Sequence, residues 1–341
     1  MRGGTVTLYD VATAAGVSPK TVSRVINGAS GVSESTRAQV EATIAELNYR
    51  PNFHARSLRV GRDKAIGVVL ESLSDPFFAN MASAIEENAL QHGYTVLVCS
   101  VGGVVEREHQ LVENLLQRQV SGLVIAPVCE DQSYLYAAAG QTPVVFVDRP
   151  AHGAQDFGTT VRADDFSAAE TATRHLLQSG HTDIALVGDR VNVHTTAERV
   201  RGYRHALETA RVGVREELVK TGVATAAQAR GAVDELLREP RPPTALFSSN
   251  ARCSLGVVPA LHARARTDIA FVSFGDFPMA DSLFPAVTVV DQDPAAIARR
   301  TTDELFGQID GMAHRGESVA LPLGLITRGS GEIPHAVTRT G

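Results

Sequence analysis

Short apolar segments that alternate with helical patterns constrain the fold of this chain more than any other feature. Four of these segments occupy residues 65–70, 95–99, 122–126 and 144–147. Continuous apolar runs of this length are typical of strands in a parallel sheet that is covered on both faces. Helical patterns fall between them, near 76–92, 104–119 and 131–139. We therefore predict a doubly wound α/β lobe in this part of the chain.

The same alternation returns after Asp164 and predicts a second lobe. Strands are expected near 184–187, 244–247 and 269–274, with helices near 166–179, 196–210, 226–238 and 252–263. A further helix is predicted at 294–309. Two arrays of similar size predict two doubly wound lobes with parallel sheets.

The N-terminus has a different pattern, in which two short helices lie on either side of a glycine. Thr7 and Asp10 have the spacing of a capping box, and Gly16 stands where the chain must turn sharply. Ser18 and Pro19 mark the start of the second helix. That helix buries Val22 together with Val25 or Ile26. Its polar, basic outer face consists of Lys20, Thr21, Ser23, Arg24 and Asn27. This is the pattern of a helix-turn-helix, although an ordinary pair of surface helices can look similar.

Charge divides the chain in the same place. Residues 1–64 hold nine Lys+Arg and five Asp+Glu, a net charge of +4, whereas the rest holds 23 and 33, a net charge of −10. A basic head on an acidic body is expected of an N-terminal segment that meets nucleic-acid phosphates while the remainder stays away from them.

Two further segments complete the head. Ser33 caps a predicted third helix that runs to about Asn48, and Pro51 ends it. The following residues, 52–61, are short and basic. By themselves, residues 52–61 are consistent with a solvated linker.

Several phrases of the head resemble, in order and at the right spacing, the lac repressor family of bacterial transcription regulators. The phrases are LYDVA, AGVS, TVSRVING, VSESTR, ELNYRPN and ARSL. A looser likeness continues through nearly the whole chain. The resemblance implies a helix-turn-helix domain at 1–50 and a hinge helix at 51–62 that inserts Leu58 into the minor groove. It also implies a sensor core at 63–341 with the fold of periplasmic sugar-binding proteins.

The motif and the resemblance together predict which residues contact DNA. They are Thr7, Ser18, Pro19, Lys20, Thr21, Ser23, Arg24, Asn27, Asn52, Ala55, Arg56, Leu58 and Arg59. An apolar wedge flanked by two arginines is suited to kinking a groove while neutralising its phosphates.

In the core the resemblance implies that the chain crosses between lobes three times, near 162–164, 288–292 and 318–322. The first lobe is then about 63–162 plus 290–318, and the second is about 163–289 plus 319–341. Residues 321–341 contain no heptad of leucines, so a homodimer is expected and no coiled-coil tetramer.

Effector-binding candidates lie at the carboxyl ends of the strands, where open α/β sheets bind ligands. They are Asp75, Phe77, Phe78, Asp148, Thr195, Arg199, Asn250, Asp276 and Gln292. Each also matches by position a residue that contacts effector in some member of the family. Carboxylate, amide and guanidinium groups with an aromatic plate suit a small polyhydroxy ligand.

Alternative roles stay open for several candidates. Asp75 can act as a helix cap, Asp148 can pair with Arg149, and Phe77 and Phe78 are equally suited to a core. The chain also departs from the family's usual pattern at three positions: Ala126, Ala251 and Gly275. Because these departures remove polar contacts, the identity of the ligand stays open.

The resulting prediction is a repressor that binds a near-palindromic operator as a dimer and is controlled by a sugar or related metabolite. Within the family, the alternatives are a co-repressor-dependent repressor and an activator that senses a nucleoside or another non-sugar metabolite. An enzyme is not expected, because no catalytic triad, phosphate loop or metal-spaced His/Cys cluster is found, and no cofactor is predicted. A free solute-binding protein would need a signal peptide and would lack the basic head. Three cysteines without a CxxC pair indicate reduced thiols in the cytoplasm. A DNA-binding regulator is expected at the nucleoid.

Overall fold

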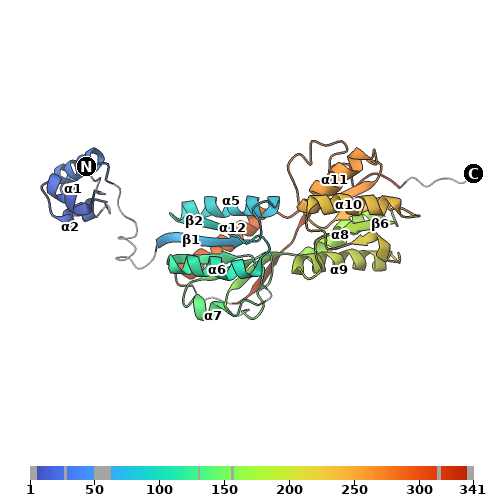
Figure 1. Cartoon of the computed structure of the whole chain (residues 1–341), viewed down its shortest axis with the longest axis horizontal. Coiled ribbons are helices and arrows are strands. Elements are labelled where there is room, and N and C mark those ends of the chain that lie inside the picture. Colours follow the sequence, from blue (N-terminus) through green and yellow to red (C-terminus); the bar gives the residue numbers. More distant parts are fainter. Residues whose placement is uncertain are drawn as a thin grey trace, which may run out of the picture. The chain divides into compact units, whose positions relative to one another are not determined.

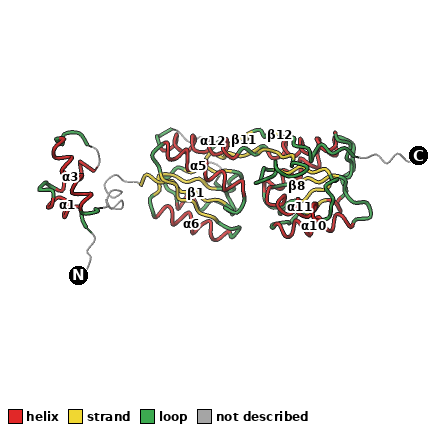
Figure 2. The backbone as a smooth tube through the Cα atoms, turned by 90° about the horizontal axis from the view of Figure 1, so that it is seen from above, coloured by secondary structure: helices red, strands yellow, loops and turns green. Residues whose placement is uncertain are grey.

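The structure is a computed structural model that describes residues 6–26, 29–49, 63–129, 131–154, 157–312 and 316–335. Its internal contacts divide the chain into two compact units, Met1–Asp63 and Lys64–Gly341. Each unit has hydrophobic core residues of its own. Figures 1 and 2 show the elements of both units.

The described part of the smaller unit contains three helices, α1 (Leu8–Ala14), α2 (Pro19–Ile26) and α3 (Glu34–Glu46). The predicted capping box is present at α1: the backbone N–H of Thr7 donates to Asp10 Oδ2 at 2.7 Å, and that of Asp10 donates to Thr7 Oγ1 at 3.3 Å. Gly16 turns the chain with φ +61°, a conformation that side chains disfavour. The helices pack around Val11, Val22 and Val40, all fully buried.

The first lobe of the larger unit is built on a six-stranded sheet with the order β11-β5-β4-β3-β1-β2. Its strands are β1 (Asp63–Leu70), β2 (Thr95–Ser100), β3 (Val120–Ile125), β4 (Val144–Val147), β5 (Thr159–Ala163) and β11 (Ser318–Leu321). One face is covered by α5 (Pro76–Gln91) and α12 (Pro294–Ile309), and the other by α6 (Val105–Gln117) and the short α7 (Leu135–Ala138) (Figure 1). Both faces are buried, which is why β3 and β4 are apolar at nearly every position.

The second lobe repeats this plan with the strand order β12-β10-β9-β8-β6-β7. Its strands are β6 (Ile184–Val187), β7 (Val219–Lys220), β8 (Ala245–Ser248), β9 (Ala270–Phe274), β10 (Thr288–Asp291) and β12 (Gly324–Ile326). The helices are α8 (Asp165–Gln178), α9 (His194–Thr209), α10 (Ala226–Arg238) and α11 (Ala251–Ala263), with a 3-10 turn η1 (Glu216–Leu218). Helices α8 and α9 pack on one face, and α10 and α11 on the other. The predicted fold, a helix-turn-helix head followed in the sequence by two doubly wound lobes, is confirmed.

Three connections join the lobes. The chain leaves the first sheet after β5, returns from β10 to α12, and crosses once more between β11 and β12. Because β10 extends to Asp291 in the second sheet and β11 extends to Leu321 in the first, the second and third crossings come a few residues later than expected. Strand β12 also runs antiparallel to β10, so the second sheet is not wholly parallel.

One predicted helix is much shorter than expected. Of 131–139, only Leu135–Ala138 forms α7. Side-chain hydrogen bonds hold the preceding residues in a loop: Gln132 Nε2 donates to Cys129 O at 2.7 Å, and Asp131 Oδ1 accepts from the backbone N–H of Ser133 at 2.8 Å. Such local bonds compete with the backbone bonds of a helix.

Among the described residues, no helix is both long enough and apolar enough to cross a membrane.

Candidate functional site

The head exposes the face of α2 that was predicted to contact DNA. Lys20 and Arg24 are exposed, whereas Val22 and Val25 of the same helix are buried. Arg24 is not fully extended toward solvent, because its Nη2 donates to Ser30 O at 2.5 Å. A basic face on a short helix that follows a tight turn has the shape and charge to enter a major groove.

The other predicted DNA contacts in the described part of the head have local partners. Thr7 Oγ1 donates to Asp10 at 2.7 Å, and Ser18 Oγ lies 2.9 Å from Thr21 Oγ1. Pro19 and Ser23 are half-buried on α2. Gln39 was not predicted, yet its Nε2 donates to Ala15 O at 3.2 Å and holds the end of α1.

Part of the predicted DNA-binding surface lies outside the described residues. This part consists of Asn27, Asn52, Ala55, Arg56, Leu58 and Arg59, together with the whole predicted hinge helix at 51–62. Their roles stay predictions.

The larger unit contains a small polar cleft between its two lobes. It lies at the carboxyl ends of strands in both sheets, the position at which α/β sheets bind ligands. Its lining includes every predicted effector residue except Asp276, namely Asp75, Phe77, Phe78, Asp148, Thr195, Arg199, Asn250 and Gln292. Their contact with an effector stays a prediction.

Arg199, on α9, is held firmly by the protein itself. Its Nε and Nη2 both lie 2.7 Å from Asp165 Oδ1, and its Nη1 donates to Ser249 O at 2.6 Å. The guanidinium also stacks on the ring of Phe274, at 3.9 Å from the centroid. Asp165 Oδ2 is buried without a hydrogen-bond partner among the described residues. Arg199 therefore presents a fixed cationic group to the cleft, with most of its donors already used.

Asp148 and Arg149 follow β4 and form an ion pair with 3.2 Å between Arg149 Nε and Asp148 Oδ2. Asp148 has φ +69°, a conformation that Asp tolerates better than most residues. Burial raises the pKa of Asp148 to about 6, although the charge of Arg149 opposes the shift. The predicted pairing is present, and Asp148 also lines the cleft.

Asp75 and the two phenylalanines combine structural roles with a place in the cleft. Asp75 is the N-cap of α5, where its Oδ1 accepts from the backbone N–H of Phe77 at 3.0 Å. Burial raises the pKa of Asp75 above its ordinary value. Phe77 and Phe78 are buried in the core of the first lobe and meet edge to face, with 5.2 Å between centroids.

Asp276 is not part of the cleft lining. Its two carboxylate oxygens accept from Arg328 Nη1 and Nη2 at 3.0 and 2.6 Å, and this bidentate pair fixes the carboxylate toward the C-terminal segment. Gln292 lies beside Gly275, the residue before Asp276. A Cβ added at Gly275 would stand 2.5 Å from Gln292 Oε1. The contact of Asp276 with an effector stays a prediction, and Arg328 already occupies both of its carboxylate oxygens.

Four charged residues of the cleft were not predicted as effector contacts: Glu71, Arg149, Asp189 and Arg252. Arg149 was expected only as a partner of Asp148. Glu71 directly follows β1, and Asp189 comes two residues after β6, so a stricter use of the strand-end rule would have found both. Arg252, at the start of α11, has no comparable sequence signal.

The lining can donate and accept many directional hydrogen bonds, as recognition of a small polar molecule requires. No cluster of His, Cys, Asp or Glu suited to a metal occurs among the described residues. The three thiols are unpaired, and burial raises the pKa of Cys129 and Cys253 to about 12, which makes them poor nucleophiles.

Comparison with known families matches both units. The family of bacterial regulatory proteins of the lacI type matches residues 7–52, and that of periplasmic binding proteins and the sugar-binding domain of the LacI family matches residues 63–309.

Individual relatives match along almost the whole chain. The HTH-type transcriptional repressor PurR of Proteus mirabilis is 31% identical over 95% of this chain and 96% of its own length. The ribose operon repressor of Escherichia coli is 29% identical over 95% of this chain and 99% of its own. A crystal structure of the lac repressor dimer bound to operator and the anti-inducer ONPF superposes with a TM-score of 0.84 at 31% identity, covering 96% of this chain and 99% of that one.

Proposed function

The chain belongs to the LacI family of bacterial regulatory proteins, and from this premise we propose that it is a transcriptional repressor controlled by a small molecule. In this proposal α2 of the head reads one half of a near-palindromic operator, and a homodimer supplies the second head. The effector, a sugar or related metabolite, binds in the cleft between the lobes. The protein acts in the cytoplasm, at the nucleoid.

The observation that carries the proposal is the joining of two chemically different parts in one chain. Residues 1–64 have a net charge of +4 and expose Lys20 on a helix that suits a major groove. The remaining residues have a net charge of −10 and form a polar cleft between two lobes. An acidic body is repelled by DNA, so the head is the part that contacts the operator.

We assign the functional regions as residues 1–50 for DNA binding, 51–62 for a hinge, and 63–341 for effector binding and dimerisation. Leu58 of the hinge is proposed to wedge into the minor groove beside Arg56 and Arg59.

The DNA-binding part of the proposal is tested with Lys20→Ala in the full-length protein. An operator is first selected from a pool of random duplexes, and affinities for it and for a scrambled duplex are measured by fluorescence anisotropy at one salt concentration. Loss of a base contact should weaken operator binding by about 1–3 kcal/mol and affect the scrambled duplex less. Arg201→Ala is the matched control, since it removes one exposed cation from the acidic unit. An equal loss on both duplexes would reduce Lys20 to a phosphate contact.

The effector part is tested with a thermal-shift screen of sugars, nucleosides and related metabolites. Operator affinity is then measured with and without each compound that stabilises the protein. An affinity that falls identifies an inducer, and one that rises identifies a co-repressor. Stabilising compounds together with no operator selected from the pool would favour a solute-binding protein.

A further inference from the structure

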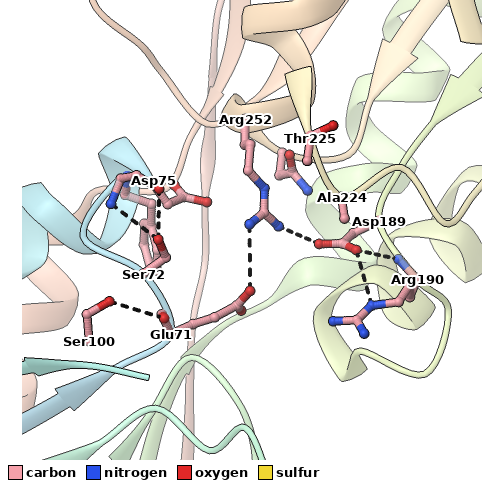
Figure 3. Close-up of polar contacts among 12 residues, drawn as sticks. Glu71, Ser72, Asp75, Ser100, Asp189, Arg190, Ala224, Thr225 and Arg252 are labelled. Carbon is pink, nitrogen blue, oxygen red and sulfur yellow. Dashed lines mark hydrogen bonds and ion pairs between the residues drawn. The ribbon is translucent and has the colours of Figure 1, made fainter. Parts of the chain in front are cut away.

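An ion-pair bridge joins the two lobes at the cleft. Arg252, in the second lobe, lies between two carboxylates: its Nη2 donates to Asp189 of the same lobe, and its Nη1 lies 3.7 Å from Glu71 Oε1 of the first lobe (Figure 3). Glu71 and Asp189 are buried, and the side chain of Arg252 is 23% exposed. Partial burial weakens the screening of these charges by solvent.

The position of Arg252 in its helix indicates that the two carboxylates hold it there. It is the second residue of α11, in the first turn, where the positive end of the helix dipole disfavours a cation. Asp189 pairs with the Arg252 guanidinium from the same lobe, and Glu71 faces that guanidinium from the first lobe. Burial raises the pKa of Glu71, but the charges of Arg149 and Arg252 outweigh this effect and hold that pKa below its ordinary value.

Each carboxylate of the bridge also has a partner within its own lobe. Glu71 accepts from Arg149 Nη2, and Asp189 Oδ1 accepts from the backbone N–H of Arg190 at 2.7 Å. The contact between Arg252 and Glu71 can therefore be broken without leaving either carboxylate unpaired. Loss of a buried ion pair is strongly destabilising only when it leaves an unpaired buried charge.

We propose that Glu71, Arg252 and Asp189 form an electrostatic latch that holds the two lobes together across the cleft. All three residues line the cleft, so any molecule that enters it meets the latch. The free energy of lobe closure then contains a contribution from the latch. If the protein is the ligand-controlled repressor proposed above, this contribution sets how much a ligand must favour one lobe arrangement over the other.

Hydrogen exchange of the full-length protein tests the latch directly. Peptides that cover 71–78 of the first lobe and 189–196 of the second are followed by mass spectrometry in the parent, Glu71→Gln, Arg252→Gln and the double variant. Opening of the cleft should speed exchange in both peptides, on the order of two- to tenfold in each single variant. The effect in the double variant should be smaller than the two single effects combined, because each single variant already loses the contact between Arg252 and Glu71.

Arg190→Gln is the matched control. Arg190 also lies near Asp189, with 3.8 Å between Arg190 Nε and Asp189 Oδ1, but it belongs to the same lobe and its side chain is 56% exposed. The Arg190→Gln variant should therefore show the same hydrogen exchange as the parent in both peptides. Unchanged exchange in Arg252→Gln, faster exchange in the second lobe alone, or the same effect in Arg190→Gln would each overturn the latch.

Operator affinity is measured on the same variants as a separate readout. If the parent binds no operator, the proposed function fails while the exchange result stands. If the parent binds operator but exchange is the same in all variants, the latch fails while the proposed function stands.

Discussion

At the scale of single residues, the charged groups of the cleft stabilise one another before any ligand is considered. Arg199 and Asp165 are both almost fully buried. The guanidinium donates to the Asp165 carboxylate and to the backbone carbonyl of Ser249, and it stacks on the ring of Phe274. A buried carboxylate without its cation is costly, so the pair is a structural unit as well as a candidate ligand anchor.

Replacing Arg199 is therefore expected to destabilise the fold. Arg199→Ala leaves the buried Asp165 carboxyl without its partner, and the free energy of unfolding should fall by about 3–5 kcal/mol. Adding Asp165→Asn should restore part of the loss, because the buried group is then neutral. Urea denaturation measures both, with exposed Arg201→Ala as the control that should change little. If Arg199→Ala unfolded like the parent, the pairing with Asp165 would contribute nothing measurable.

Asp148 makes the stability of the larger unit depend on pH. Its pKa is about 6 in the folded protein and near 3.8 when unfolded, so the folded state binds more protons between these values. The free energy of unfolding should therefore fall by about 3 kcal/mol from this group as pH rises from roughly 4 to 6. Asp148→Asn removes this titration, and Asn tolerates positive φ.

The measurement is denaturant unfolding of the parent and Asp148→Asn at several values between pH 4.5 and 7.5. The stability of the variant relative to the parent should increase as pH rises through about 6 and then level off. A difference that stays constant with pH would show that Asp148 does not titrate there.

At the scale of elements, small residues set how closely neighbouring helices pack in the second lobe. A Cβ at Gly256 of α11 would stand 2.2 Å from Ala226 O and 2.6 Å from the Cβ of Ala229, both on α10. These neighbours include backbone, so a larger side chain can be accepted only by moving one helix away from the other.

Two alanine substitutions distinguish this packing from intrinsic helix propensity. Gly256→Ala should lower the free energy of unfolding by about 1–3 kcal/mol through overpacking. Gly231→Ala, on α10 with no atom within 4 Å of the added Cβ, should raise it by roughly 0.5–1 kcal/mol. Thermal unfolding of the two variants measures the sign of each change in the free energy of unfolding. A stabilising effect of Gly256→Ala would mean that the helices separate at little cost.

At the scale of the whole molecule, each unit has its own core, and the chemistry differs between them. The head has a polar, basic helix face over a small apolar core. The two lobes bury strands on both faces of their sheets, and charged residues line the cleft at the ends of these strands. For an effector to alter DNA binding, it must bind one lobe arrangement more tightly than another. The residues that connect the lobes, including Arg252, therefore bear on regulation as much as those that would contact the ligand.

The sequence alone was sufficient for features with a local cause. The capping box at Thr7, the turn at Gly16 and the α2 face were predicted because hydrogen bonds and helical spacing extend over only a few residues. The central strands were equally evident, since burial on both faces requires continuous apolar runs.

Features that depend on distant partners were decided only by the tertiary structure. The short strands β5, β11 and β12 have no distinctive pattern. Strand β5 pairs with the preceding β4 and with the remote β11, and β12 pairs with β10. Asp276 and Asp148 look alike at their strand ends, yet Arg328 holds Asp276 away while Arg149 keeps Asp148 in the cleft. Arg252 meets Glu71 only because two lobes close on each other. Sequence periodicity reports which face of an element is buried, whereas the choice of partner depends on three-dimensional packing.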